Sequence, residues 1–274
     1  MRRVLPGALR TLYGACAMAA FSLMFLVATI LALVVPRLDW RRRITHRLAT
    51  LALPVFGLRV AVTGLENLPP ANCVVIANHA SYLDGIIMKA VLPPRFSFVI
   101  KREAASLPLA GFLLKRIGSE FVDRHSEGGR RRDALRVLRV AESGRALVFF
   151  PEGTFDAVPG LKRFHVGAFA AAVRGGMPIV PVVILGARRA MPGGAILVRP
   201  GRIRVEILAP IDVPPSVHAA DEMRSAARRR MVARLDEPDL APAVASAGGR
   251  VVGYATSASP GSRSPCRDAA STSL

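Results

Sequence analysis

The stretch Cys73-Val74-Val75-Ile76-Ala77-Asn78-His79-Ala80-Ser81-Tyr82-Leu83-Asp84 joins an apolar run to a histidine and an acid that lie five positions apart. The apolar run predicts a buried strand, and Ser81 followed three residues later by Asp84 is typical of a helix N-terminus. In one continuous helix, a five-residue offset would turn the two side chains about 140° apart. They can meet only if His79 lies on the turn between strand and helix, as an exposed base with Asp84 as its orienting acid. The alternative is a capped helix with an incidental histidine.

A second apolar strand ends in the block Phe149-Phe150-Pro151-Glu152-Gly153-Thr154. Together the two segments resemble the glycerolipid acyltransferase family typified by lysophosphatidate acyltransferase. That family carries four ordered blocks, namely NHxSxxD, GxxFxxR, FPEGT and an apolar strand with a proline. This sequence has all four in order, at Asn78–Asp84, Gly118–Arg124, Phe149–Thr154 and Val180–Ile184. The resemblance spans roughly Val60 to Pro210.

The resemblance implies that a fatty acyl group moves from a thioester cosubstrate, acyl-CoA or acyl carrier protein, to a lipid hydroxyl. No further cofactor and no metal is expected. Because the nucleophile belongs to the substrate, His79 would act as a base that takes the hydroxyl proton and returns it to the leaving thiolate. Asp84 would fix the imidazole tautomer and stabilise the imidazolium. The sequence has no G-x-S-x-G elbow, which favours direct transfer over a covalent serine route.

The second and third blocks supply candidates for binding the substrate. Arg124 would clamp the acceptor's phosphate, because a planar guanidinium can donate two parallel hydrogen bonds. Glu152 and Gly153 would shape the acceptor pocket, since a carboxylate accepts from a hydroxyl and glycine lets the backbone approach a ligand. Lys101, which follows an apolar strand, is a secondary anion-binding candidate. The predicted substrate-binding residues are Asn78, Ser81, Lys101, Arg124, Glu152, Gly153 and Thr154.

The third block departs from its commonest form, which continues with arginine and serine, because Phe155-Asp156 follow here. A possible phosphate-binding cation is therefore absent, with Lys162 and Arg163 as candidates to replace it. The predicted acceptor is the lysophospholipid 1-acylglycerol-3-phosphate, which would give phosphatidic acid. One alternative is the same chemistry on another lysolipid, such as lyso-ornithine lipid. A non-catalytic, basic protein that binds the membrane surface is the hypothesis from a different class.

The chain has 274 residues, a hydrophobic content of 51% and a formal net charge of +19. Such a charge suits nucleic acid, an anionic membrane or phosphorylated substrates. The aromatic content of 6%, the lack of a reader motif and the apolar N-terminus argue against nucleic acid. The basic residues comprise 34 Arg and 4 Lys, which is typical of a GC-rich bacterial source. The three cysteines have no disulfide or metal spacing.

The N-terminus predicts a membrane anchor helix over residues 1–37. No residue between Arg10 and Arg37 is charged, and Thr11–Val35 alone would form a helix of about 37 Å, against a hydrocarbon core of about 30 Å. A cleaved signal peptide is disfavoured, because the apolar run is long and a cluster of arginines follows it. The same arginines favour a catalytic domain on the cytoplasmic side of a bacterial inner membrane, in contact with anionic lipids.

The rest of the chain predicts three further segments. Residues 38–58 would form an interfacial amphipathic helix, and the first two helices together could instead dip into one leaflet, a monotopic arrangement that hydropathy does not distinguish from a span. Residues 59–240 would form a single α/β acyltransferase domain with a mixed sheet flanked by helices. The expected strands are 59–63, 73–77, 96–100, 120–122, 146–150, 179–184 and 203–208, and the expected helices are 131–143, 164–174 and 213–235. Residues 241–274 lack periodicity and are expected to be disordered.

Overall fold

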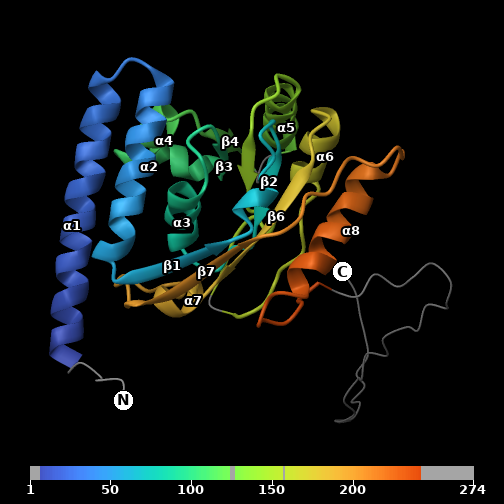
Figure 1. Cartoon of the computed structure of the whole chain (residues 1–274). Coiled ribbons are helices and arrows are strands. Elements are labelled where there is room, and N and C mark those ends of the chain that lie inside the picture. Colours follow the sequence, from blue (N-terminus) through green and yellow to red (C-terminus); the bar gives the residue numbers. More distant parts are fainter. Residues whose placement is uncertain (1–6, 124–126, 157, 242–274) are drawn as a thin grey trace, which may run out of the picture. The chain divides into compact units, whose positions relative to one another are not determined.

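A seven-stranded sheet lies at the centre of the computed structural model, which describes residues 7–123, 127–156 and 158–241 (Figure 1). The order across the sheet is β1-β7-β6-β2-β5-β3-β4. Every neighbouring pair is parallel except β6 and β7, so the predicted mixed sheet is confirmed. The strands are β1 (Leu58–Thr63), β2 (Val74–Ala77), β3 (Ser97–Lys101), β4 (Glu120–Val122), β5 (Leu147–Phe149), β6 (Ile179–Leu185) and β7 (Gly201–Ile207).

Strand β2 separates two apolar cores because its side chains alternate between the faces of the sheet. Val75 and Ala77 belong to one core, and Val74 and Ile76 belong to the other. All four residues of the strand are fully buried, as expected for a parallel strand with helices on both sides. The turn that follows β2 is therefore attached to a strand buried on both faces.

Helices cover both faces of the sheet. The first core includes apolar residues of α2 and α3, and the second includes residues of α5, α6 and α8. Helix α1 packs against α2 and α4, and Figure 1 shows α1 and α2 side by side. The helices are α1 (Gly7–Val34), α2 (Leu38–Val55), α3 (Leu83–Val91), α4 (Ala110–Arg116), α5 (Glu127–Glu142), α6 (Gly167–Arg174), α7 (Ala187–Ala190) and α8 (Ala219–Val232), with single 3-10 turns at Leu65–Asn67 and Arg102–Ser106.

The strand positions agree with the sequence to within about two residues, whereas two helices begin later than expected. Helix α8 begins at Ala219 rather than Val213. Pro214 and Pro215 have no backbone N–H to donate, and each proline disfavours helical geometry in the residue before it. Helix α6 begins at Gly167 because the backbone of the preceding segment bonds elsewhere. His165 donates its N–H to Pro151 O (2.8 Å), and Lys162 donates to Glu152.

Helix α1 is held against the rest of the domain at both ends. Near its start the Tyr13 hydroxyl donates to Val55 O (3.0 Å), and near its end Arg116 Nε donates to Ala32 O (2.9 Å). Its segment Thr11–Val34 has a mean hydropathy of 2.5 and is long and apolar enough to cross a membrane. Many of its leucine and valine side chains are exposed on the side away from α2. The helix therefore lies along the domain and carries its own apolar outer surface.

Helix α2 belongs to the packed domain, because it contacts α3 and β1 and buries Ala52 and Leu53. It also buries a charge: the Arg42 guanidinium donates to Ile117 O (3.0 Å), Arg95 O (3.2 Å) and the Ser97 hydroxyl. The expected interfacial role of residues 38–58 stays a prediction. The expected disordered segment, residues 241–274, lies outside the described residues except for Ala241.

Replacing Arg42 by methionine is expected to lower the free energy of unfolding by at least about 2 kcal/mol, because buried carbonyl oxygens would lose their donor. Denaturant unfolding in detergent micelles, followed by circular dichroism, measures the change. The exposed neighbour Arg43 provides the matched control, and Arg43→Met is expected to stay within about 0.5 kcal/mol of wild type. Equal stability of the two variants would contradict the structural role of Arg42.

Candidate active site

His79 and Asp84 meet at the carboxyl end of β2. The strand ends at Ala77 and helix α3 begins at Leu83, so His79 lies on the intervening turn, as its offset from Asp84 requires. Its Nδ1 lies 2.9 Å from Asp84 Oδ2. The histidine side chain is 19% exposed, and the carboxylate is completely buried. With Nδ1 bound to the acid, Nε2 is the ring nitrogen left to exchange a proton with a substrate.

The Asp84 carboxylate also fixes the shape of the loop that carries the histidine. Its Oδ2 accepts the backbone N–H groups of Ala80 (2.6 Å) and Ser81 (2.8 Å) in addition to the imidazole contact. The bond to Ser81 is half of the predicted capping box. The Ser81 hydroxyl accepts from Leu83 N rather than from Asp84 N. The helix accordingly begins at Leu83, one residue later than the full capping box would place it. One buried acid therefore sets both the loop and the imidazole.

Asn78 and Ser81, which were predicted to bind substrate, hold this loop to the fourth sequence block and its continuation. The Asn78 amide accepts from Ile184 N (2.7 Å) and donates to Ile184 O (3.0 Å), so it pairs with β6 as a strand residue would. The Ser81 hydroxyl donates to Met191 O (2.7 Å). Both side chains are thus engaged within the protein, and their direct contact with a substrate stays a prediction.

Glu152 connects the third sequence block to the first. Its Oε1 accepts the backbone N–H of His79 (2.6 Å), and its Oε2 accepts that of Lys162 (2.8 Å). Burial raises the pKa of the Glu152 carboxyl to about 7, with a further upward contribution from the Asp84 charge, while the two backbone donors lower it. The carboxyl lies inside the protein, so the structure gives it a role in holding the loops together, and its contact with an acceptor hydroxyl stays a prediction.

Two aromatic rings contact the imidazole, and a third contacts one of them. The Phe150 ring is stacked on His79 with centroids 4.4 Å apart, and the Phe155 ring meets the imidazole edge-on at 4.5 Å. Phe155 in turn contacts Tyr82 at 4.7 Å, nearly perpendicular. Phe155 stands where the commonest form of the third block has an arginine, and here it forms an apolar cover beside the base. We call Phe150, Phe155 and Tyr82 the aromatic cover.

An apolar cavity of about 280 Å³ extends from Tyr82 between α1, α2, α3, β3 and α4. Because Tyr82 belongs both to its lining and to the aromatic cover, the cavity begins beside that cover. Lys89 lies two turns further along α3 and is the charged member of the lining. Burial lowers the pKa of the Lys89 ammonium to about 8, with Arg42 as a second cause. The lining includes Phe21, Met24, Phe25, Ala28, Leu48, Ala49, Ile86, Phe98, Ile100, Leu113 and Leu114.

The remaining predicted residues have mixed positions. Gly153 has a φ of +81°, a conformation that favours glycine, in the tight turn after Glu152. Thr154 is exposed beside that turn. Lys101 is half-exposed at the end of β3 and pairs with Glu103 at 3.1 Å, away from the dyad's contacts. Arg124 lies outside the described residues, so its predicted phosphate contact stays a prediction.

Comparison with known proteins places the chain among acyltransferases. A family model described as Acyltransferase matches residues 59–185. The 1-acyl-sn-glycerol-3-phosphate acyltransferase of Saccharomyces cerevisiae is 30% identical over 245 residues, which cover 86% of this chain and 80% of the yeast protein. The chain belongs to the glycerolipid acyltransferase family. The chloroplastic 1-acyl-sn-glycerol-3-phosphate acyltransferase BAT2 of Brassica napus is also 30% identical, over 68% of this chain, but the match spans only 56% of that relative.

A solved structure shares the fold of this acyltransferase family member. The crystal structure of the 1-acyl-sn-glycerophosphate (LPA) acyltransferase from Thermotoga maritima superposes with a TM-score of 0.69 at 20% sequence identity. The match covers 81% of this chain and 92% of the Thermotoga chain. The likeness therefore extends over most of the chain and confirms the expected fold class.

Sequence reasoning missed the side chains that surround the base. Phe150 lies inside the third block and Phe155 just after it. The sequence shows that Phe155 replaces the arginine of the commonest form of this block, but it does not show that the ring contacts His79. The apolar cavity was also missed, because it combines α1 and α2 with α3 and β3, which are far apart along the chain. Glu152 was identified from its block, but not its bond to the His79 backbone.

The raised pKa of Glu152 predicts a pH dependence of stability. The folded state holds a proton on Glu152 up to about pH 7, whereas an unfolded glutamate loses it near pH 4.5, so the free energy of unfolding should decrease as the pH rises between these values. Glu152→Gln does not titrate, and its profile should lack this decrease. Urea unfolding from about pH 5 to 8 compares the two slopes, and parallel profiles would contradict the assignment.

Proposed function

We propose that this chain transfers a fatty acyl group from an acyl thioester to the free hydroxyl of 1-acylglycerol-3-phosphate, producing phosphatidic acid. The observation that carries the proposal is the His79–Asp84 pair, whose aromatic cover shares Tyr82 with the lining of an apolar cavity. A base with its orienting acid suits proton removal from a hydroxyl, and the cavity suits a hydrocarbon chain. The names of the relatives, 1-acyl-sn-glycerol-3-phosphate acyltransferases from yeast and plant, support the acceptor.

In the proposed reaction, His79 Nε2 removes the proton from the acceptor hydroxyl while that oxygen attacks the thioester carbonyl carbon. The resulting tetrahedral intermediate collapses, the carbon–sulfur bond breaks and the imidazolium returns its proton to the thiolate. Asp84 stabilises the imidazolium through the Nδ1 hydrogen bond and keeps Nε2 free of its proton beforehand. The products are the ester and the free thiol, so the acyl group never resides on the protein.

The surroundings of the base support direct transfer from a thioester. Phe150 and Phe155 cover the imidazole and limit the access of water, which would otherwise compete with the lipid hydroxyl as nucleophile. The cavity beside Tyr82 would hold an acyl chain with its carbonyl end near His79. The donor would be acyl-CoA or acyl carrier protein.

A second acceptor class has one observation in its favour. Phe155 places an aromatic ring, rather than a guanidinium, against His79 and Tyr82. The site therefore lacks one cation that would attract a phosphate monoester, and another lysolipid, such as lyso-ornithine lipid, is the alternative acceptor. The reaction and the base would be the same for both acceptors.

We further propose that α1 and α2 seat the enzyme in one leaflet of the bacterial inner membrane, with the domain on the cytoplasmic side. Support comes from the two ends of α1, which are bonded to Val55 and to Arg116 of the same unit. A helix tied along the domain in this way would dip into the membrane together with it. The apolar cavity borders α1, so an acyl chain and a lipid acceptor would reach the site from the bilayer.

His79→Ala and Asp84→Asn are each expected to reduce kcat at least about 100-fold, because general-base catalysis contributes about two to four orders of magnitude. Product formation from an acyl thioester and lysophosphatidate, measured by mass spectrometry on membranes, tests this. His218 is exposed and far from the site in sequence, so His218→Ala is the matched control and should retain wild-type turnover. Turnover by His79→Ala at the control rate would refute the proposed function.

Phe155→Arg is expected to shift acceptor choice toward phosphate-bearing lysolipids, because it restores a cation beside the base. The measurement is kcat/KM for lysophosphatidate relative to a lysolipid without a phosphate monoester, and the ratio should rise at least several-fold over wild type. Phe155→Leu, which removes the ring without adding charge, separates the effect of the cation from the loss of the aromatic cover. An equal ratio in all three proteins would exclude position 155 from acceptor recognition.

A further inference from the structure

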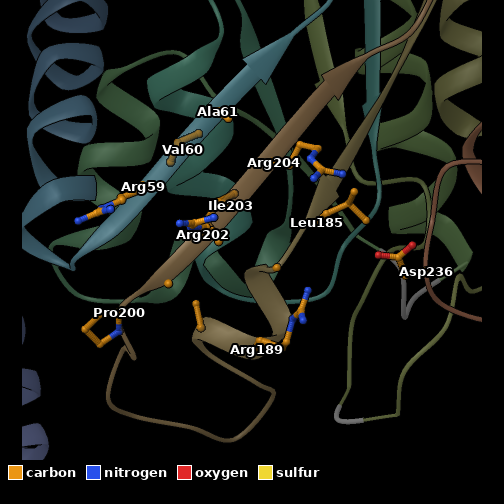
Figure 2. Close-up of a pocket in the computed structure, with 13 residues that line it drawn as sticks. Arg59, Val60, Ala61, Leu185, Arg189, Pro200, Arg202, Ile203, Arg204 and Asp236 are labelled. Atoms are coloured by element: carbon orange, nitrogen blue, oxygen red, sulfur yellow. The ribbon is translucent and has the colours of Figure 1, made fainter. Parts of the chain in front are cut away.

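A hollow lined by arginines lies on the outer face of β1 and β7, apart from the apolar cavity (Figure 2). It has a volume of about 980 Å³. Arg59 extends from β1, Arg202 and Arg204 extend from β7, and Arg189 extends from α7 toward the strands. Asp236 is the acidic residue of the lining and forms no ion pair with them in the described part of the chain. We call this feature the arginine hollow.

The strand register places two of these arginines side by side on neighbouring strands. Arg59 is the register partner of Arg202 in the parallel pair of β1 and β7, so their Cα atoms belong to strands about 4.8 Å apart and both side chains leave the same face. Like charges at such positions destabilise a sheet. Arg204 follows on the same face, opposite the small side chain of Ala61. The strand pairing therefore concentrates positive charge on one face of the sheet, and this charge does not stabilise the fold.

The face that carries these arginines is open. Along β7, Arg202 and Arg204 are exposed while Ile203 and Val205 are buried in the core on the other side. Elsewhere, arginines that cluster share carboxylates: Arg102 and Arg136 both pair with Asp133.

In the arginine hollow, by contrast, only Arg204 has an ion pair among the described residues, at 3.8 Å from Glu206. Arg59, Arg189 and Arg202 are exposed and have none. Three guanidinium groups are thus free to bind an external anion.

We propose that the arginine hollow is a phosphate-binding site, which takes a phosphate ester carried either by a soluble molecule or by a lipid headgroup. Planar guanidinium groups bind phosphate oxygens through paired, charge-assisted hydrogen bonds, and a bound phosphate would offset the repulsion between Arg59 and Arg202.

The site adjoins the catalytic loop through α7, because Arg189 lines the hollow and Met191, just after this helix, accepts the Ser81 hydroxyl bond. If the proposed function holds, a phosphate bound in the hollow would anchor a substrate beside that loop. Only this role in substrate binding rests on the proposed function; the phosphate site itself does not.

Direct binding tests the site without requiring turnover. Titration calorimetry of the full chain in neutral detergent micelles uses inorganic pyrophosphate as the soluble probe. A second arm measures binding to nanodiscs of phosphatidylcholine with and without phosphatidic acid. The variant Arg59→Gln/Arg202→Gln is expected to lose at least tenfold in affinity for at least one probe. The control Arg139→Gln/Arg229→Gln removes the same charge from two exposed arginines on α5 and α8 and should stay within twofold of wild type.

The outcome of each arm identifies the source of the phosphate. If the hollow variant, but not the control, loses affinity for pyrophosphate, the site binds soluble phosphate esters. If the hollow variant alone loses affinity and only for nanodiscs that contain phosphatidic acid, the site binds lipid headgroups. The proposal is overturned if the hollow variant and the control bind both probes equally. Thermal unfolding guards against a folding artefact, because removal of the Arg59–Arg202 repulsion should leave the melting temperature unchanged or higher. If the double variant unfolds, Arg202→Gln alone serves in both arms.

Discussion

The Asp84 carboxylate is the group on which the catalytic end of this structure depends. A single buried oxygen accepts the imidazole N–H of His79 and the backbone N–H groups of Ala80 and Ser81. The three donors belong to the turn between β2 and α3, so the same charge that orients the base also determines the path of the chain. Three donors converge on Oδ2 and offset part of the cost of burying the carboxylate, while Oδ1 is buried without a hydrogen-bond partner. Base, orienting acid and loop shape therefore form one unit.

The other sequence blocks meet this unit because of the sheet topology. Strands β5, β2 and β6 are neighbours and parallel, so the segments that follow them emerge at one edge, where open α/β sheets place their ligands. Glu152, after β5, bonds the His79 backbone, and Asn78 bonds Ile184 in β6. Blocks separated by about a hundred residues in the sequence thus converge on one loop. The charges and apolar surfaces needed for acyl transfer are assembled by strand order rather than by sequence proximity.

Much of this arrangement could be predicted from the sequence, and the reasons are physical. Apolar runs such as Val74–Ala77 identify buried strands, and the five-residue offset between His79 and Asp84 requires a turn at the histidine. The sequence could not show that Asn78 and Ser81 bond to β6 and Met191, because those partners are about a hundred residues away. The two prolines, Pro214 and Pro215, indicate from the sequence alone that α8 begins after them. The prediction of a helix from Val213 was therefore wrong at its start.

Features made by tertiary packing were beyond sequence reasoning. The aromatic cover depends on Phe155 turning toward His79, and the apolar cavity depends on α1 packing beside α2 and α4. The arginine hollow requires the β1–β7 register, which brings Arg59 beside Arg202 although they are far apart in the chain. The sequence places Arg59 at the start of one expected strand and Arg202 just before another, and only the pairing of the strands shows that their charges accumulate.

Direct acyl transfer requires that the acyl group pass straight from thioester to lipid without residing on the protein. In a rapid-mixing experiment, wild-type protein would receive an acyl thioester first and lysophosphatidate second, with thiol release and intact protein mass recorded at each stage. Direct transfer predicts no thiol release and no gain in protein mass before the acceptor is added, followed by thiol and diacyl product in equal amounts. A stoichiometric burst of thiol with an acylated protein before the acceptor arrives would contradict it.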